Sequence, residues 1–157
     1  MKKLLLSLLL LTACSPHQDY IQDVNIFTSV DPQLQVYFNR YTAKTGLSTA
    51  GVTGGFIALP SGVAGMCVYN SVSNEVRIDP AYWASIQNND ILLEQLVFHE
   101  LTHCVLHLGH IYDVAPNGQP LSIMYPVAFN ATQGIYLQSR ETDYISAMIG
   151  NVPITYP

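Results

Sequence analysis

Basic side chains are scarce in this sequence, and they do not cluster. The 157 residues contain six Lys and Arg, eleven Asp and Glu and five His, and the formal net charge at pH 7 is −5. Beyond the first few residues the cations stand singly, at Arg40, Lys44, Arg77 and Arg140. A nucleic-acid groove needs a stripe of basic residues to neutralise phosphates, so we expect no nucleic-acid partner.

Charged residues of both signs are also few. They make up 11% of the chain, whereas hydrophobic residues make up 49%. A disordered tail or a solenoid rich in Glu and Lys would show a different balance, so both classes are excluded. No internal repeat is visible, and the length corresponds to one domain of about 100–150 residues.

The N-terminal apolar run is too short to span a membrane, since a spanning helix needs about 20 residues. It covers residues 4–11, follows Lys2 and Lys3, and leads into Leu-Thr-Ala-Cys at 11–14. A basic start, a short apolar core and small residues before a cysteine resemble a bacterial lipoprotein signal peptide. The alternative is an ordinary secretory signal in which Cys14 is incidental.

The resemblance to a lipoprotein implies three segments: a signal peptide over 1–13, a tether over 14–30 that carries lipid on Cys14, and a single domain over 31–157. Removal of two lysines makes the mature chain more acidic. It would contact a membrane through its lipid in the bacterial envelope. Ser15 follows the cysteine in place of aspartate, which favours the outer membrane in Gram-negative bacteria.

Only three cysteines are present, and two remain once Cys14 is assigned to lipid. In an oxidising compartment such a pair is more often bridged than free, which favours a disulfide between Cys67 and Cys104. The alternative is a pair of buried thiols that pack as small apolar groups.

Turn residues and apolar periodicity predict the elements that precede residue 90. A helix begins at Asp31-Pro32 and ends at Gly46, with apolar residues at helical spacing between them. Residues 24–30 are a weak strand candidate. Two apolar segments at 66–70 and 75–79 flank turn residues and predict a hairpin. The second alternates polar and apolar residues, which predicts one solvent-exposed face.

A long helix over 91–106, capped by Asn89-Asp90, carries the most specific motif of the chain. His99 and His103 are four residues apart on one face, about 6 Å along the axis, so both imidazoles can reach one ion. Glu100 lies about 100° around the helix, where it can take a proton from zinc-bound water without binding the metal. The alternative is a histidine-rich, solvated helix face.

A third zinc ligand has to come from beyond this helix. His107 continues the same stripe, but it lies about 9 Å along the axis from the midpoint of His99 and His103. Gly109 can turn the chain, and His110 follows directly. We therefore expect His110 to bind the metal, and His107 to be a helix-end cation or a group that supports the ligands.

These residues resemble the metzincin metallopeptidases, whose pattern is H-E-x-x-H-x-x-G-x-x-H followed by a turn with a methionine below the metal. His99, Glu100 and His103 match the pattern. Ser-Ile-Met-Tyr-Pro at 122–126 resembles the Met-turn of the matrixin branch, which assigns Met124 to it, although Met124 could also be a core residue. A closing helix over 137–150 is similar to that of the same branch.

The resemblance implies an α+β fold of the zincin type: a twisted mixed sheet, an active-site helix and a C-terminal helix. It further implies a zinc ion, and a peptide bound along the edge strand of the sheet above it. The sequence departs from the family pattern because His110 comes one residue late and Leu106 stands where glycine is expected. His107, Asp113 and Glu141 are therefore alternatives for the third ligand.

The sequence predicts a zinc-dependent metalloendopeptidase that acts on peptides or proteins outside the cytoplasm. Its alternatives are a metal-binding or metal-delivery lipoprotein, and a peptide-binding module on a zincin scaffold without turnover. The position of Glu100 favours the enzyme, because a protein that only binds metal has no use for that carboxylate. The sequence leaves the substrate and the oligomeric state open.

Overall fold

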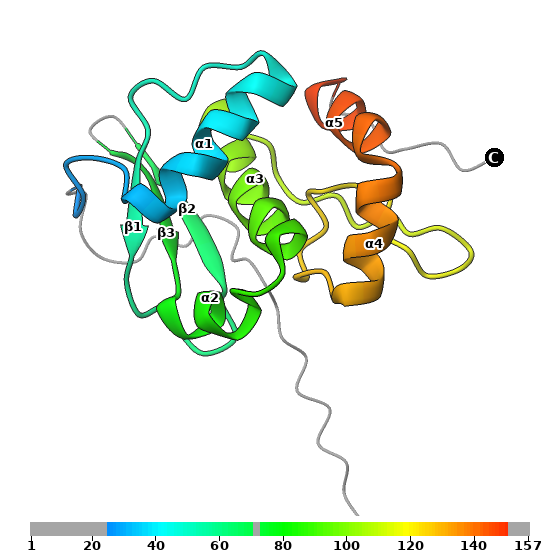
Figure 1. Ribbon diagram of the computed structural model, residues 1–157. Coiled ribbons are helices and arrows are strands. Elements are labelled where there is room, and N and C mark those ends of the chain that lie inside the picture. The colour runs from blue at the N-terminus through cyan, green and yellow to red at the C-terminus, as the bar shows by residue number, and fades with distance from the viewer. Residues whose placement is uncertain (1–24, 71–72, 151–157) are drawn as a thin grey trace, which may run out of the picture.

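The computed structural model describes residues 25–70 and 73–150. In these ranges the chain forms an α+β fold with a three-stranded mixed sheet and five helices (Figure 1). The signal peptide expected over 1–13, Cys14 and the first part of the expected tether lie outside the described residues. None of the helices in the described ranges has the length and apolar character that crossing a bilayer requires.

The sheet has the strand order β1-β3-β2. The central strand β3 (Asn74–Ile78) pairs in parallel with β1 (Thr53–Phe56) and antiparallel with β2 (Gly65–Tyr69). The predicted hairpin is confirmed by the second pairing, in which Tyr69 lies opposite Asn74. The strand predicted over 24–30 is not present in its described part, where Val30 forms only an isolated parallel bridge to Gly54.

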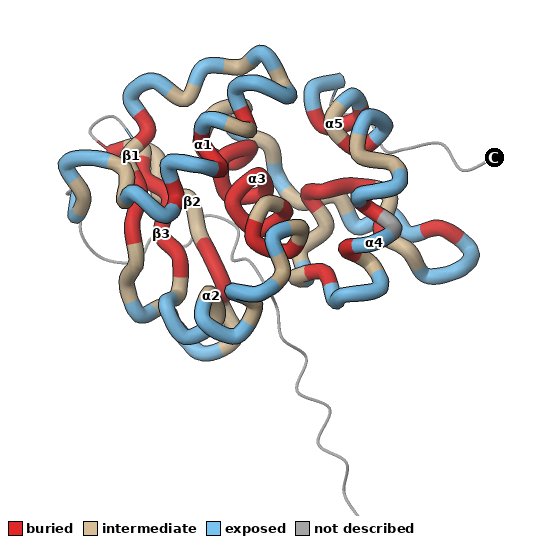
Figure 2. The backbone as a smooth tube through the Cα atoms, in the orientation of Figure 1, coloured by how far each residue is buried: buried red, intermediate tan, exposed pale blue. Residues whose placement is uncertain are grey.

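Two long helices build the core beside this sheet. The predicted boundaries of α1 (Pro32–Thr45) are confirmed: the Asp31 side chain accepts from the Gln33 N–H, and Gly46 ends the helix at φ 74°. The other, α3 (Asp90–Leu106), begins after Asn89 and contacts β2, β3, α1 and α4. Because neighbours surround it, α3 is buried on nearly all sides (Figure 2).

The sequence predicted a solvent-exposed face for the strand over 75–79, and this prediction is wrong for β3. Glu75 and Arg77 are 0% and 6% exposed. The Arg77 Nε donates to Glu75 Oε1 at 2.6 Å, and Oε2 of Glu75 accepts the backbone N–H groups of Ile26 and Phe27 at 2.8 and 2.7 Å. The segment before α1 therefore covers this side of the sheet, which the local alternation of β3 could not indicate.

The C-terminal part contains two helices where the sequence predicted one over 137–150. They are α4 (Ala131–Ser139) and α5 (Glu141–Gly150), and they meet at Arg140. A capping box between Asn130 and Gln133 begins α4 earlier than expected. A further short helix, α2 (Pro80–Ile86), begins after Asp79 and was not predicted.

Candidate metal centre

Three histidine side chains converge at the C-terminal end of α3. The Nε2 atom of His103 lies 3.1 Å from that of His99 and 3.2 Å from that of His110. His99 and His103 are 3% and 7% exposed. Within residues 25–70 and 73–150 these three form the single group of His, Cys, Asp or Glu side chains that could hold a metal ion.

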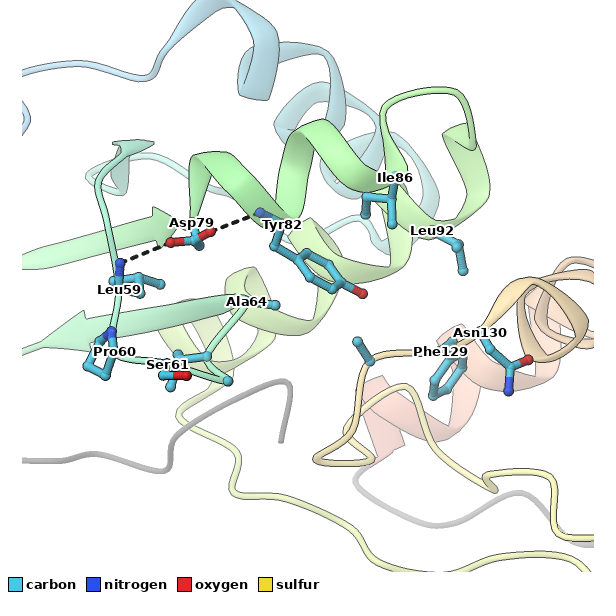
Figure 3. A pocket seen from close by; sticks show the side chains of 13 residues that line it. Leu59, Pro60, Ser61, Ala64, Asp79, Tyr82, Ile86, Leu92, Phe129 and Asn130 are labelled. Atoms are coloured by element: carbon cyan, nitrogen blue, oxygen red, sulfur yellow. Dashed lines mark hydrogen bonds between the residues drawn. The ribbon is translucent and has the colours of Figure 1, made fainter. Parts of the chain in front are cut away.

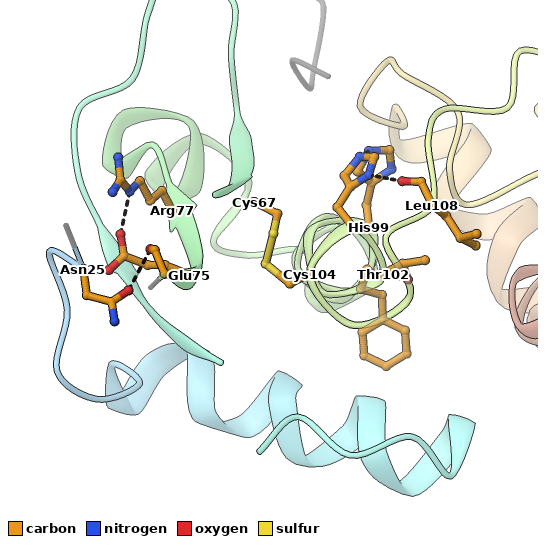
Figure 4. Close-up of a disulfide and its surroundings, with 11 residues drawn as sticks. Asn25, Cys67, Glu75, Arg77, His99, Thr102, Cys104 and Leu108 are labelled. Carbon is orange, nitrogen blue, oxygen red and sulfur yellow. Dashed lines mark hydrogen bonds and ion pairs between the residues drawn. A yellow bond between two sulfur atoms is a disulfide. The ribbon is translucent and has the colours of Figure 1, made fainter. Parts of the chain in front are cut away.

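Backbone carbonyls orient two of the three rings. Nδ1 of His99 donates to the Ile123 oxygen at 2.7 Å. Nδ1 of His103 donates to the Leu108 oxygen at 2.5 Å, and Figure 4 marks the bond to this oxygen. Since a carbonyl oxygen only accepts, the proton of each neutral ring lies on Nδ1, and the Nε2 lone pair faces the cluster. Two such lone pairs 3.1 Å apart repel each other unless a cation lies among them.

Burial keeps these imidazoles neutral. It lowers the pKa of His99 well below 6.5, and the neighbouring His103 lowers it further. Burial also lowers the pKa of His103, and the pKa of His110 falls to about 4 through burial and the proximity of His103. A metal ligand must be the neutral ring, so the cluster is in its ligating form at neutral pH.

His110 reaches the cluster because the chain turns sharply at the end of α3. The turn lies at His107, which adopts φ 53° and ψ 33°, while its ring stacks on Tyr69 at 4.5 Å. The residue with a positive φ in this turn is His107, whereas the φ of Gly109 is not positive. His107 is thus directed away from the cluster as the helix-capping residue.

The other two alternative ligands also lie outside the cluster. Asp113 is not part of the histidine group, and its backbone oxygen accepts from the Leu121 N–H at 2.9 Å. The Glu141 carboxylate accepts from Lys44, which also bonds Glu94 on α3. That ion pair joins α1, α3 and α5 and leaves Glu141 as a structural group.

The segment 122–124 supports the histidines from the other side. The carbonyl of Ile123 holds His99, and the carbonyl of Met124 accepts the N–H of Ile111, the residue after His110. Met124 itself is 0% exposed, and its N–H donates to the Ser122 hydroxyl at 3.0 Å. The carbonyls of Ile123 and Leu108 gave no signal in the sequence, because any residue supplies one.

Glu100, the residue after His99, is fully buried, and its side chain lies against the edge strand β2. A disulfide between Cys67 on β2 and Cys104 on α3 joins the same two elements, with a Cα–Cα distance of 5.6 Å (Figure 4). Of the two arrangements that the sequence allowed for these cysteines, the structure has the bridge.

A pocket of about 450 Å³ lies at the start of β2, and neither Glu100 nor any of the three histidines lines it. It lies between the loop that leads into β2, helix α2 and the segment that follows Pro126, and Tyr82 reaches across it toward Phe129 (Figure 3). Ala64, which lines the pocket, directly precedes the glycine that contacts Glu100. Most of the lining side chains are apolar: Leu59, Pro60, Val63, Ala64, Ile86, Leu92, Ala128 and Phe129.

Comparison with models of known families, with curated protein sequences and with solved structures found no match. The described site combines three converging imidazoles with a buried carboxylate at the position of α3 that follows His99.

Proposed function

We propose that this protein is a zinc-dependent endopeptidase of the metzincin type. The observation that carries the proposal is the convergence of three Nε2 atoms, with a buried glutamate directly after the first histidine. A three-histidine set with an open fourth position is the donor set of catalytic zinc, whereas structural zinc sites have four protein ligands.

The geometry of the donors suits the ion. Ligands bound tetrahedrally at about 2.0–2.1 Å lie about 3.3–3.4 Å from each other. The Nε2 separations of 3.1 and 3.2 Å are close to that value. When bound, zinc polarises a peptide carbonyl and lowers the pKa of a water molecule.

The side chains of this chain supply the proton transfers. Glu100 accepts a proton from the attacking water while the water oxygen bonds to the carbonyl carbon of the peptide. The same carboxyl then donates that proton to the amide nitrogen as the C–N bond breaks, which gives a carboxylic acid and an amine; the acid passes its remaining proton to the amine, which leaves a carboxylate and an ammonium group. The carbonyls of Ile123 and Leu108 keep His99 and His103 in the ligating tautomer.

The position of the turn supports the metzincin resemblance. The family pattern places a turning glycine three residues before its third histidine. Here the turn residue is His107, and His110 follows it by three residues. Relative to the family pattern, this chain therefore has one extra residue in the helix, before the turn. That insertion explains why Leu106 stands at the glycine position and why the third histidine comes one residue late.

The surroundings of the site suit a peptide substrate. Among the described residues no further strand follows β2 in the sheet, and an extended peptide that adds to this edge would bind by backbone hydrogen bonds. The pocket beside Ala64 would take an apolar side chain next to the scissile bond. The lipid anchor at Cys14 and the placement in the bacterial envelope remain parts of this proposal that rest on sequence.

Metal content and cleavage of a peptide library, measured together, test the proposal. We expect Glu100→Ala to keep one zinc and to lose at least about 10²-fold in kcat, because the general base is removed. His110→Ala should lose tight zinc binding, and His107→Ala, the matched control, should keep it. Wild type that holds zinc but cleaves no peptide would support the non-catalytic metal-binding or peptide-binding alternatives.

A further inference from the structure

The carboxylate of Glu100 rests against a glycine on the edge strand. Gly65 is the first residue of β2, and it is buried. A Cβ atom at this position would lie 2.7 Å from Oε1, 2.9 Å from Cγ and 3.0 Å from Cδ of Glu100. All three distances are shorter than ordinary van der Waals contact, so Glu100 occupies the space that any other residue at 65 would fill.

Glu100 has little room to avoid such a side chain. It is 0% exposed, so it cannot turn outward into solvent. Its Cγ atom lies as close to the glycine as its carboxylate does, so rotation about the last bond alone does not relieve the overlap. Since packed interiors accommodate added atoms poorly, a methyl group at 65 would move the carboxylate relative to the histidines.

The disulfide fixes the strand in the register that creates this contact. Cys67 is two residues after Gly65, so both face the same side of β2. Cys104 is four residues after Glu100, so both lie on the same face of α3. The Cys67–Cys104 bridge therefore lies beside the contact between Gly65 and Glu100, on the same two faces.

We propose that Gly65 is the positioning residue for Glu100: the bare Cα of the edge strand sets where the carboxylate stands beside the histidine cluster. This inference rests on the proposed peptidase function for its catalytic consequence, although the contact itself does not. A displacement of the general base by about 1 Å costs about 10²-fold in rate.

A double-mutant cycle on the full-length chain tests the contact without any activity. Gly65→Ala should lower the Tm by several degrees in the wild-type background and far less in Glu100→Ala, where Cγ and the carboxylate are absent. The matched control is Gly54→Ala on β1, whose Cβ would meet Val76 and Phe38. Its effect should be equal in both backgrounds. Additive effects of Gly65→Ala and Glu100→Ala would overturn the inference.

The visible absorption spectrum of Co²⁺ bound to the full-length chain tests whether the carboxylate has moved relative to the metal. Gly65→Ala should bind one Co²⁺ and change its visible absorption spectrum, and the change should be absent when Glu100→Ala is also present. A spectrum that is unchanged by Gly65→Ala would overturn the inference, since the carboxylate would not have moved relative to the metal.

Kinetics then separate positioning from general destabilisation. With zinc bound, Gly65→Ala should lower kcat about 10²-fold and change KM by less than about threefold. A kcat that falls by less than about threefold in Gly65→Ala would contradict the positioning role. If wild type cleaves no peptide while the cycle remains non-additive and the spectrum shifts, the peptidase proposal fails and the role of Gly65 stands.

Discussion

At the scale of single residues, the histidine cluster depends on which ring nitrogen carries the proton. Backbone oxygens of Ile123 and Leu108 hold that proton on Nδ1 of His99 and His103. Burial further disfavours a second proton on each ring and lowers the pKa of His110 to about 4. The site is thus prepared for a cation by hydrogen bonding and desolvation together.

These lowered pKa values predict acid sensitivity of the metal-free protein. The unfolded chain takes up protons on its histidines near pH 6.5, whereas the folded cluster resists protonation until about pH 4 at His110. Below pH 6.5 the unfolded state therefore binds more protons, and the free energy of unfolding falls as the pH falls toward 4. Urea unfolding at pH 7.5, 6 and 5 measures this slope.

The control for the pH experiment is His110→Asn, which removes one of the shifted groups and leaves the carboxylates of the chain unchanged. Its free energy of unfolding should fall less steeply between pH 6.5 and pH 4 than that of wild type. Equal slopes would show that His110 does not contribute to the acid sensitivity.

The sequence predicted the position of His107 at the end of the helix, but not the backbone conformation that it adopts there. Its distance along the helix excluded it from the cluster, and the structure places it at the helix end. That it would adopt a positive φ was not predictable, because histidine usually avoids that region. Its ring contact with Tyr69, 38 positions earlier in the numbering, helps to stabilise this conformation.

At the scale of elements, the edge strand β2 and the helix α3 are held together by a covalent bond and by close packing. The disulfide joins them, and Gly65 and Glu100 pack together beside it. The sequence favoured the bridge from the cellular compartment alone. The predicted strand over 66–70 and helix over 91–106 already held the two cysteines, and only the packing of β2 against α3 decided that their sulfur atoms meet.

Breaking the Cys67–Cys104 bridge should destabilise the protein without unfolding it at room temperature. The cysteines are 37 positions apart, and releasing a loop of that size costs about 3–4 kcal/mol of the free energy of unfolding through the entropy of the unfolded chain. Urea unfolding with and without reductant measures the loss. Cys67→Ala/Cys104→Ala is the control, because reductant should leave its stability unchanged.

At the scale of the whole molecule, the sheet has two covered sides. Val76 and Ile78 point into the core that α1 and α3 share, and they are 0% exposed. Glu75 and Arg77 point to the opposite side, where the backbone N–H groups of Ile26 and Phe27 bond the Glu75 carboxylate. The buried carboxylate therefore attaches the segment before α1 to the central strand.

Removal of Glu75 should be among the most damaging changes away from the metal site. Glu75→Ala leaves the Arg77 guanidinium buried without its carboxylate and removes the acceptor of two backbone N–H groups. Breaking one side of such a pair costs about 3–5 kcal/mol. Denaturant unfolding measures the change, and metal binding should persist while the chain is folded.

The comparison for this change is Glu75→Ala/Arg77→Ala, which removes both charges. If the cost of Glu75→Ala comes from the uncompensated guanidinium, the double variant should lose less stability than the sum of the two single variants. Additive losses would contradict the proposed role of the pair.

The sequence by itself determined the features that local chemistry controls. Asp31-Pro32 and Gly46 bound α1, and Asn89 begins α3, because caps act on the nearest backbone groups. The spacing of His99 and His103 placed both imidazoles on one face of α3, because the helical period is fixed. The α+β class was implied by the family resemblance of the motifs, and the described chain has it.

Only the tertiary structure decided the rest. It brought His110 to the other two histidines, because a turn at His107 and a hydrogen bond to Met124 direct the chain back. It also buried the polar face of β3 and placed Gly65 beside Glu100. These contacts join residues that are distant in sequence, and their formation depends on how whole elements pack, which no local pattern encodes.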